Sequence, residues 1–321
     1  MNRMKFFTRI AFLAIVLPWA ITSCNKINDE EVSDNQKVAL HLRSGGEAMF
    51  RSTFLDADTQ IPANEKIMVY VDETGGAVLY EKNILTADGS GYLDSPSPMY
   101  FPTSGNSVNI YALHTNATFS VVYPTTQLIH VVSADQTTLA GYEPSDLLYA
   151  KETNVAKTSK TIPLTFYHLL SKLQVAVEAG TGLTAGDIAG MTINGTNLQA
   201  TFLLDKAAAP NQIAVGPVST ASASPIKIGA DVSMDFYAGD IQYNDAIIVP
   251  QTLDAGTAFI TVQLTGGGNL VYRLPAATTF ESGKKYEYRI VANLGGLTLT
   301  TTIEDWIPVG TDPVTGEAVA E

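Results

Sequence analysis

Apolar and polar residues alternate along many short segments of this 321-residue chain. An alternation of period two places successive side chains on opposite faces of a strand. The segments that show it are 67–72, 108–112, 119–123, 173–178, 260–264, 270–274, 286–290 and 297–303. The pattern therefore predicts half-buried β-strands over these ranges.

Glycine-rich turns separate the later segments, at Gly266–Gly268, Ser282–Gly283 and Gly295–Gly296. Consecutive strands joined by such turns predict a β-meander, and frequent short strands favour antiparallel sandwiches over a parallel sheet. Only residues 166–171 and 184–189 have patterns that allow a turn or two of helix. Charged residues make up 16% of the chain, and Thr, Val, Tyr and Gly are plentiful, which also favours β structure.

The N-terminus has the layout of a secretory signal peptide. Arg3, Lys5 and Arg9 precede a twelve-residue, almost wholly apolar stretch from Ile10 to Ile21. This stretch is shorter than the roughly 20 residues that a spanning helix needs. Residues 1–23 are therefore expected to be a leader for export through the Sec route.

Cys24 follows this leader directly, and the preceding Ile21-Thr22-Ser23 resembles the lipobox of bacterial lipoproteins. We expect signal peptidase to cut before Cys24, whose acyl chains, such as palmitate, would hold the protein on the outer membrane. The alternative is a buried thiol, although a cysteine next to a leader has no core to enter. Because Cys24 is the only cysteine, no internal disulfide is expected.

Removal of residues 1–23 takes away three basic residues and moves the formal net charge from −13 to −16. Such an acidic chain is expected to have no nucleic-acid partner. Residues 24–36 are acidic with few apolar positions, which predicts a solvated tether. An acidic run here also resembles a surface-export signal of some Bacteroidetes lipoproteins.

The remaining length suggests two domains, at residues 37–160 and 161–321. In the first of these, Val38, Leu40 and Leu42 alternate and predict the first strand.

No motif indicates catalysis, a cofactor or a metal. The sequence contains no Gly-x-Ser-x-Gly elbow and no P-loop ending. Its four histidines lack the ligand spacing of a zinc site. His168 is expected to hydrogen-bond within a core or an interface, and Trp306 to pack onto the β-sheets rather than to stack on carbohydrate. The chain is therefore predicted not to be an enzyme.

Several segments resemble the fimbrillin family of Bacteroidales. They are Asp146-Leu147-Leu148-Tyr149-Ala150, the run Leu164-Thr165-Phe166-Tyr167-His168-Leu169-Leu170-Ser171-Lys172-Leu173, Val249-Pro250-Gln251, Phe280 to Tyr288, and Ile303-Glu304-Asp305-Trp306. The resemblance implies an all-β fold of two antiparallel, transthyretin-like β-sandwich domains in tandem. It also implies a structural subunit of surface fimbriae that mediates cell adhesion.

The resemblance further implies an assembly route. A lipidated precursor reaches the cell surface, and an Arg- or Lys-specific protease removes the N-terminal segment with its first strand. The C-terminal segment of another subunit then fills the opened groove as a donor strand, in a homo- or hetero-polymer.

On this chain the two candidate cleavage sites are Arg43 and Arg51, each next to small residues, although both could be ordinary surface arginines. The candidate donor segment is 306–321, with Trp306, Ile307 and Val309 at its start. Pro308 and Pro313 make it a mediocre strand. A competing hypothesis is a monomeric surface lipoprotein that binds glycans through exposed aromatic residues such as Tyr92, Tyr100 or Tyr142.

Overall fold

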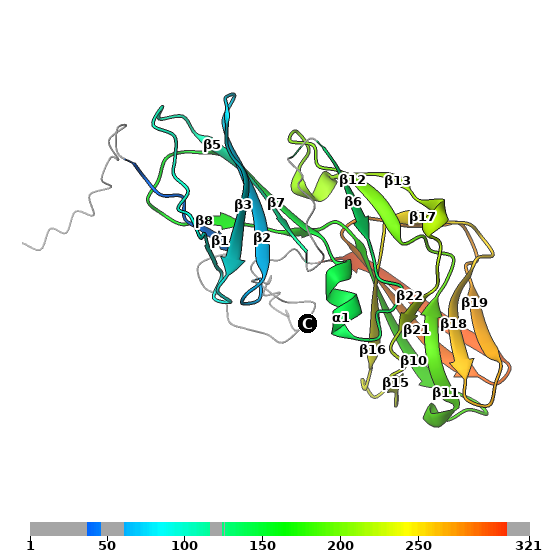
Figure 1. Cartoon of the computed structure of the whole chain (residues 1–321). Helices are drawn as coiled ribbons and strands as arrows, with labels where there is room; N and C mark the ends of the chain where they lie inside the picture. Colours follow the sequence, from blue (N-terminus) through cyan, green and yellow to red (C-terminus); the bar gives the residue numbers. More distant parts are fainter. Residues whose placement is uncertain (1–36, 46–60, 116–123, 125, 307–321) are drawn as a thin grey trace, which may run out of the picture. The chain divides into compact units, whose positions relative to one another are not determined.

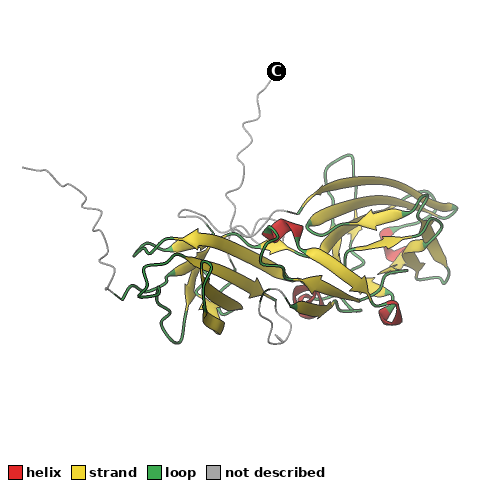
Figure 2. Cartoon of the chain, turned by 90° about the horizontal axis from the view of Figure 1, so that it is seen from above, coloured by secondary structure: helices red, strands yellow, loops and turns green. Residues whose placement is uncertain are grey.

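Strands account for most of the described chain in the computed structural model (Figure 2). The structure describes residues 37–45, 61–115, 124 and 126–306. Within these ranges the only α-helix is α1 (Leu139–Tyr142). Single 3-10 turns are η1 (Glu143–Ser145), η2 (Ala185–Asp187), η3 (Pro210–Gln212) and η4 (Thr220–Ser222). The all-β prediction is confirmed, and none of these helices is long and apolar enough to cross a membrane.

Residues 42–168 supply the strands of an eight-stranded sheet (Figure 1). Its order is β8 (Ile162–Leu164), β1 (Leu42–Ser44), β4 (Tyr92–Asp94), β3 (Val78–Ala87), β2 (Lys66–Glu73), β5 (Val108–His114), β7 (Leu148–Val155) and β9 (Tyr167–His168). β1 and β8 run parallel, whereas β1 and β4 are antiparallel, as are the remaining neighbours. The central strand β2 is buried on both faces from Ile67 to Asp72, which agrees with its almost continuous apolar run. The half-buried strand predicted there is therefore a fully buried one.

Residues 127–305 form four smaller sheets. The largest contains β10 (Ser171–Ala179), β15 (Val232–Ser233), β16 (Tyr243–Ile248), β21 (Lys284–Asn293) and β22 (Gly296–Asp305). The next contains β14 (Ile226–Ile228), β11 (Ile188–Ile193), β18 (Ala258–Leu264) and β19 (Asn269–Arg273). The remaining two contain β13 (Ala214–Val218), β12 (Gln199–Leu203) and β6 (Gln127–Val131), and then β17 (Gln251–Leu253) and β20 (Thr278–Phe280).

One large hydrophobic cluster joins these sheets. β10 and β21 run parallel, and their paired residues Leu173 and Tyr286 both enter the cluster. β11 and β18 add Met191 and Val262 from the second sheet. Met68 of the eight-stranded sheet also belongs to it. Because alternate residues of β10 and of β21 point into this cluster, burial explains the period-two pattern of these two segments.

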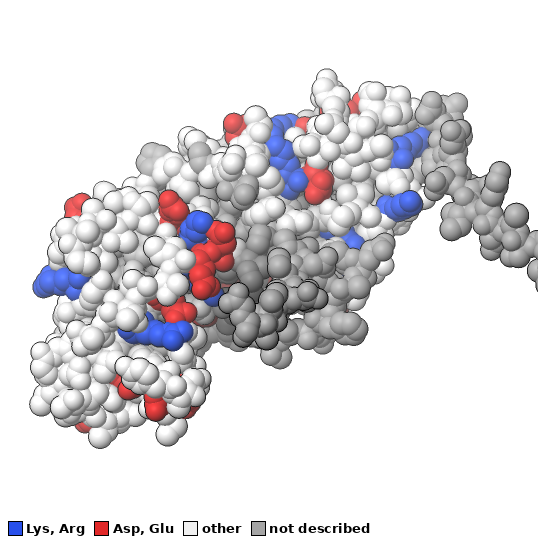
Figure 3. Space-filling model, turned by 180° about the vertical axis from the view of Figure 1, so that it is seen from behind, with Lys and Arg blue, Asp and Glu red and all other residues white. Residues whose placement is uncertain are grey.

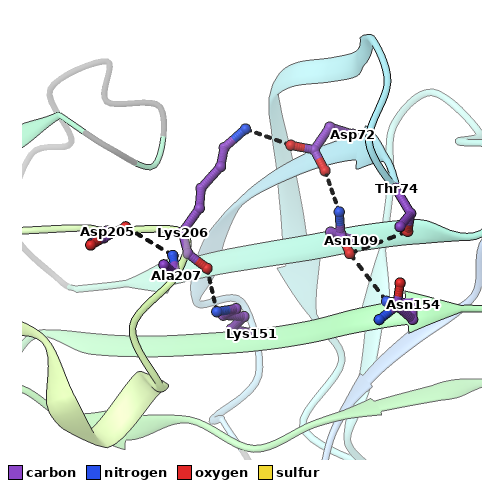
Figure 4. A network of polar contacts seen from close by, with 8 residues as sticks. All are labelled: Asp72, Thr74, Asn109, Lys151, Asn154, Asp205, Lys206 and Ala207. Carbon is purple, nitrogen blue, oxygen red and sulfur yellow. Dashed lines mark hydrogen bonds and ion pairs between the residues drawn. The ribbon is translucent and has the colours of Figure 1, made fainter.

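A polar network ties the loop after β12 to the eight-stranded sheet (Figure 4). Lys206 Nζ lies 2.5 Å from the carboxylate of the buried residue Asp72, and Asn109 Nδ2 donates to the other oxygen at 2.8 Å. Lys151 on β7 donates to the carbonyl oxygens of Lys206 and Ala208. A buried carboxylate is costly unless it is paired, so Lys206 compensates the charge of Asp72.

Most strongly alternating segments are confirmed as strands, namely β2, β5, β10, β18, β19, β21 and β22. Residues 119–123 lie outside the described residues. The meander prediction is wrong beyond the pairs β18–β19 and β21–β22, since β21 pairs with the distant β10 and β20 pairs with β17. Residues 166–171 form no helix, because β9 and the start of β10 lie there. The boundary between residues 160 and 161 stays a prediction, as does the tandem sandwich.

Candidate assembly site

Residues 37–45, called the N-terminal strand below, lie inside the eight-stranded sheet rather than at its edge. Within this segment, β1 pairs antiparallel with β4 on one side and parallel with β8 on the other. Ahead of β1, a bridge between Ala39 and Tyr100 continues the pairing toward the chain's start. The N-terminal strand therefore has hydrogen-bonded neighbours along both of its edges.

Backbone hydrogen bonds on both sides hold this segment. The Leu40 N–H donates to the Met99 carbonyl at 2.9 Å. On the opposite side, the Ile162 N–H donates to the His41 carbonyl at 2.8 Å. Residues 99–101 and β4 thus form one wall beside the N-terminal strand, and β8 forms the other.

The inward face of the N-terminal strand is apolar. Val38, Leu40 and Leu42 are only 8%, 6% and 2% exposed, respectively. Leu42 is paired with Leu93 on one side and Ile162 on the other, so these three side chains share one face of the sheet. Burial of such aliphatic side chains contributes about 1.5–3 kcal/mol each. The segment is an integral part of the fold.

The outward face carries two basic residues, each beside a tyrosine. Lys37 Nζ lies 3.9 Å from the centroid of the Tyr100 ring. The Arg43 guanidinium carbon lies 5.4 Å from the centroid of the Tyr92 ring, and Arg43 is directly paired with Tyr92. A cation over the face of a tyrosine is attracted by the negative potential of the ring.

Removal of residues 37–45 would leave unpaired backbone groups on β8, on β4 and on residues 99–101. It would also uncover the apolar side chains beneath Val38, Leu40 and Leu42. Two open edges with an apolar floor favour insertion of another strand. We call this position between the two walls the N-terminal groove.

Arg43 lies within β1 and is 7% exposed. A protease binds its substrate as an extended, accessible chain, so cleavage after Arg43 would require β1 to leave the sheet first. The other predicted site residues Cys24, Arg51, Ile307 and Val309 lie outside the described residues.

Trp306, the last described residue, follows the outermost strand β22 and is 5% exposed. Its backbone N–H donates to the Gly283 carbonyl at 2.8 Å, and its indole stacks on the ring of His168. The expected packing of Trp306 and the expected hydrogen bonding of a buried His168 are both confirmed. A donor segment in this chain would therefore start after Trp306, which is fixed to its own subunit.

Asp146 bonds to His168, the residue on which Trp306 stacks. His168 Nδ1 donates to Asp146 Oδ2 at 2.9 Å, and the Leu147 N–H donates to Oδ1 at 2.8 Å. Burial by itself would raise the pKa of Asp146, but the neighbouring His168 and these hydrogen bonds hold it below its ordinary value. An ionised Asp146 keeps the His168 ring in the orientation that stacks on Trp306.

Other candidate chemistry receives less support. Among the residues that the structure describes, no group of three or more His, Cys, Asp and Glu is arranged to hold a metal. Tyr92 is 48% exposed, but Tyr142 is buried at 6%, which contradicts its assignment as an exposed glycan-stacking aromatic. On the face seen in Figure 3, acidic and basic side chains are interspersed among uncharged ones.

The sequence pattern does not predict the walls of the N-terminal groove. Met99, Phe101 and β8 lie far from residues 37–45 in the chain and have no extended alternating pattern. The sequence indicates Tyr92 and Tyr100 only as candidate exposed aromatics, not as partners of Arg43 and Lys37. Only the basic residues at the two ends of the alternating segment, Lys37 and Arg43, hint in the sequence that aromatic partners lie beside it.

Known proteins resemble this chain in sequence and in fold. A model of the family described as fimbrillin-like matches residues 51–306. A Bacteroides uniformis protein named as a candidate fimbrium subunit, Fim1C, is 26% identical over 280 residues, which cover 82% of this chain and 88% of that protein.

Two solved structures show the same fold. A candidate cell adhesion protein from Bacteroides uniformis superimposes with a TM-score of 0.62 at 22% identity, covering 84% of this chain and 98% of that one. The tip fimbrial protein Mfa3 of Porphyromonas gingivalis, with a C-terminal truncation, gives a TM-score of 0.50 at 12% identity, covering 84% and 100%.

Proposed function

Because the chain belongs to the fimbrillin-like family, we propose that it is a structural, non-enzymatic subunit of surface fimbriae that mediates cell adhesion. Its similarity to a candidate fimbrium subunit supports the same role. The observation that carries the assembly mechanism is the interior position of the N-terminal strand, which is paired on both edges. A strand in that position can be replaced only by another strand, and a strand from a second subunit links two molecules.

The proposed route begins with export and lipidation. Residues 1–23 direct the chain through the Sec route, and acyl chains on Cys24 hold the precursor on the outer membrane. In this state residues 37–45 fill the N-terminal groove, so the precursor presents no open edge there. Lipidation would be read from the intact mass of the membrane-bound protein, with Cys24→Ser as the unlipidated control.

Proteolysis then opens the groove. Of the two candidate arginines, we assign the cut to Arg51, because Arg43 is buried within β1 and paired on both sides. A cut after Arg51 also separates the entire N-terminal strand from the rest of the subunit. The strand can then leave and be exchanged.

The C-terminal segment is the proposed donor to a further subunit. Trp306 is fixed to its own subunit, so the segment that begins at Ile307 and Val309 would extend from a defined point. Contacts of this head-to-tail kind do not close on themselves and therefore build filaments.

Folded full-length protein treated with an Arg-specific protease tests this route. We expect intact mass and N-terminal sequencing to show a new terminus at Ser52, and electron microscopy and gel filtration of the chain mixed with the other fimbrial subunits to show oligomers only after cleavage. Arg51→Gln should block trimming and assembly, whereas the matched control Arg273→Gln, at an exposed arginine, should change neither. Clean trimming that leaves only monomers in the presence of those other subunits would contradict the proposal.

A further inference from the structure

Hydrogen bonds hold the backbone of the two tyrosines beside the N-terminal strand. The Tyr100 N–H donates to the Tyr80 hydroxyl at 2.8 Å, and the Tyr92 N–H donates to Asp88 Oδ1 at 3.0 Å. Tyr92 also belongs to β4, which forms part of one groove wall. The backbone is thus held at both tyrosines, and their rings lie beside Lys37 and Arg43.

Any strand that fills the groove meets these rings at defined positions. Residues 37, 39, 41 and 43 share the outward face, because successive side chains of a strand alternate. Arg43 is opposite Tyr92, and Lys37 reaches Tyr100 from two residues before the bridged Ala39. A cation at each of these two positions gains an attraction that an uncharged residue lacks.

The Tyr92 ring stabilises the buried guanidinium of Arg43. Arg43 is 7% exposed, and its Nε is buried without a hydrogen-bond partner. A buried guanidinium with an unsatisfied nitrogen needs another source of stabilisation, and the Tyr92 ring supplies one. The groove thus accommodates a basic residue at a position that is otherwise unfavourable for charge.

The chain's own residues 307–321 do not match these requirements. They contain no Lys or Arg, so no register, in either direction, places a cation beside Tyr92 or Tyr100. In the direction of the N-terminal strand, Ile307 and Val309 can replace Val38 and Leu40. That register sets Asp312, an anion, against the face of the Tyr92 ring.

Backbone hydrogen bonding also disfavours residues 307–321 in the groove. The Ser44 N–H donates to the Gly91 carbonyl at 2.8 Å. In the register that places Ile307 at the position of Val38, Pro313 falls at the position of Ser44. Proline has no N–H and cannot make this bond.

We propose that Tyr92 and Tyr100 make the N-terminal groove selective for a donor strand with three alternating aliphatic residues flanked by basic residues. The donor that replaces residues 37–45 is then a segment of a different subunit, and not residues 307–321 of a second copy of this chain. This inference rests on the proposed strand exchange, and it assigns this groove to a hetero-polymeric contact.

Peptide exchange into the full-length folded protein tests the selectivity. A specific protease site replaces residues 47–50, so that the N-terminal strand can be cut free without relying on Arg51. A labelled peptide of residues 36–46 exchanges into the groove and is then competed with unlabelled peptides. These are the same peptide, its double variant Lys37→Gln and Arg43→Gln, and a peptide of residues 307–321.

We expect the double-variant peptide to compete about tenfold more weakly, because it loses two cation–π contacts, each worth at least on the order of 0.5–1 kcal/mol. The peptide of residues 307–321 should compete more weakly still. In the protein, Tyr92→Leu and Tyr100→Leu should each abolish part of the preference for basic residues. Tyr237→Leu, at a fully exposed tyrosine outside the groove, is the matched control.

The outcomes separate the two proposals. Equal competition by all three peptides would overturn the selectivity while leaving strand exchange intact. Failure of every peptide to enter the cut protein would overturn strand exchange and the selectivity together. Because the peptide variants leave the protein unchanged, a folding defect in a tyrosine variant cannot mask the result.

Discussion

The indole ring of Trp306 stacks on the imidazole ring of His168, with the two centroids 3.6 Å apart and the planes inclined by 8°. His168 belongs to β9 of the eight-stranded sheet, whereas Trp306 follows β22 of a different sheet. The stack therefore joins two sheets and fixes the residue after which the proposed donor segment begins. Asp146 orients the imidazole through its contact with Nδ1.

Trp306→Ala should lower the free energy of unfolding by about 3 kcal/mol, because it removes a buried aromatic side chain and leaves a cavity. Trp306→Phe should lose less, since a phenyl ring keeps much of the stacking on His168. Urea denaturation followed by circular dichroism measures both changes. Equal stability of the wild type and Trp306→Ala would show that the stack contributes nothing to the fold.

Two buried histidines predict a loss of stability in mild acid. Burial lowers the pKa of His114 and of His130, although hydrogen bonds to the carbonyls of Lys66 and Ser145 oppose the shift. Each folded-state pKa lies below the unfolded value of about 6.5, so the unfolded chain binds more protons in that window. Their contribution to stability is thus complete above pH 6.5 and is lost as the pH falls through the folded pKa values.

Urea midpoints measured between pH 8 and pH 5 test this expectation. His114→Gln and His130→Gln should each flatten the decline, because glutamine can donate a hydrogen bond but does not titrate. His41→Gln, at an exposed histidine, serves as the control and should leave the slope unchanged. A decline that both buried variants retain in full would assign the acid sensitivity to other groups.

Gln136 provides a third prediction, because its side chain bonds both backbone groups of one residue on β16. Its Oε1 accepts from the Ile247 N–H at 2.7 Å, and its Nε2 donates to the Ile247 carbonyl at 2.8 Å. Gln136 is 4% exposed, and Ile247 is fully buried. Gln136→Ala leaves two buried backbone groups unpaired and should cost about 2–4 kcal/mol.

Chemical denaturation of Gln136→Ala measures that cost, with Gln127→Ala at an exposed glutamine on β6 as the matched variant. Gln127→Ala should stay within about 0.5 kcal/mol of the wild type. If both variants unfold at the same urea concentration, the paired hydrogen bonds of Gln136 do not stabilise β16.

The sequence by itself determined the class of structure and many of its strands. Alternation over residues 67–72, 173–178 and 286–290 predicted β2, β10 and β21, because the period of a strand is a local property that burial imposes on neighbouring residues. The apolar Val38, Leu40 and Leu42 likewise indicated the N-terminal strand. The expected roles of His168 and Trp306 also followed from the chemistry of their side chains.

Only the tertiary structure decided which strands are neighbours. The parallel pairing of β10 with β21, and of β1 with β8, joins segments that are far apart in the chain and leaves no local periodic signal. The same holds for Tyr92 and Tyr100, which become groove residues only because the sheet places Arg43 and Lys37 beside them. Local alternation records that a side chain is buried, whereas the identity of its partner depends on how distant segments pack.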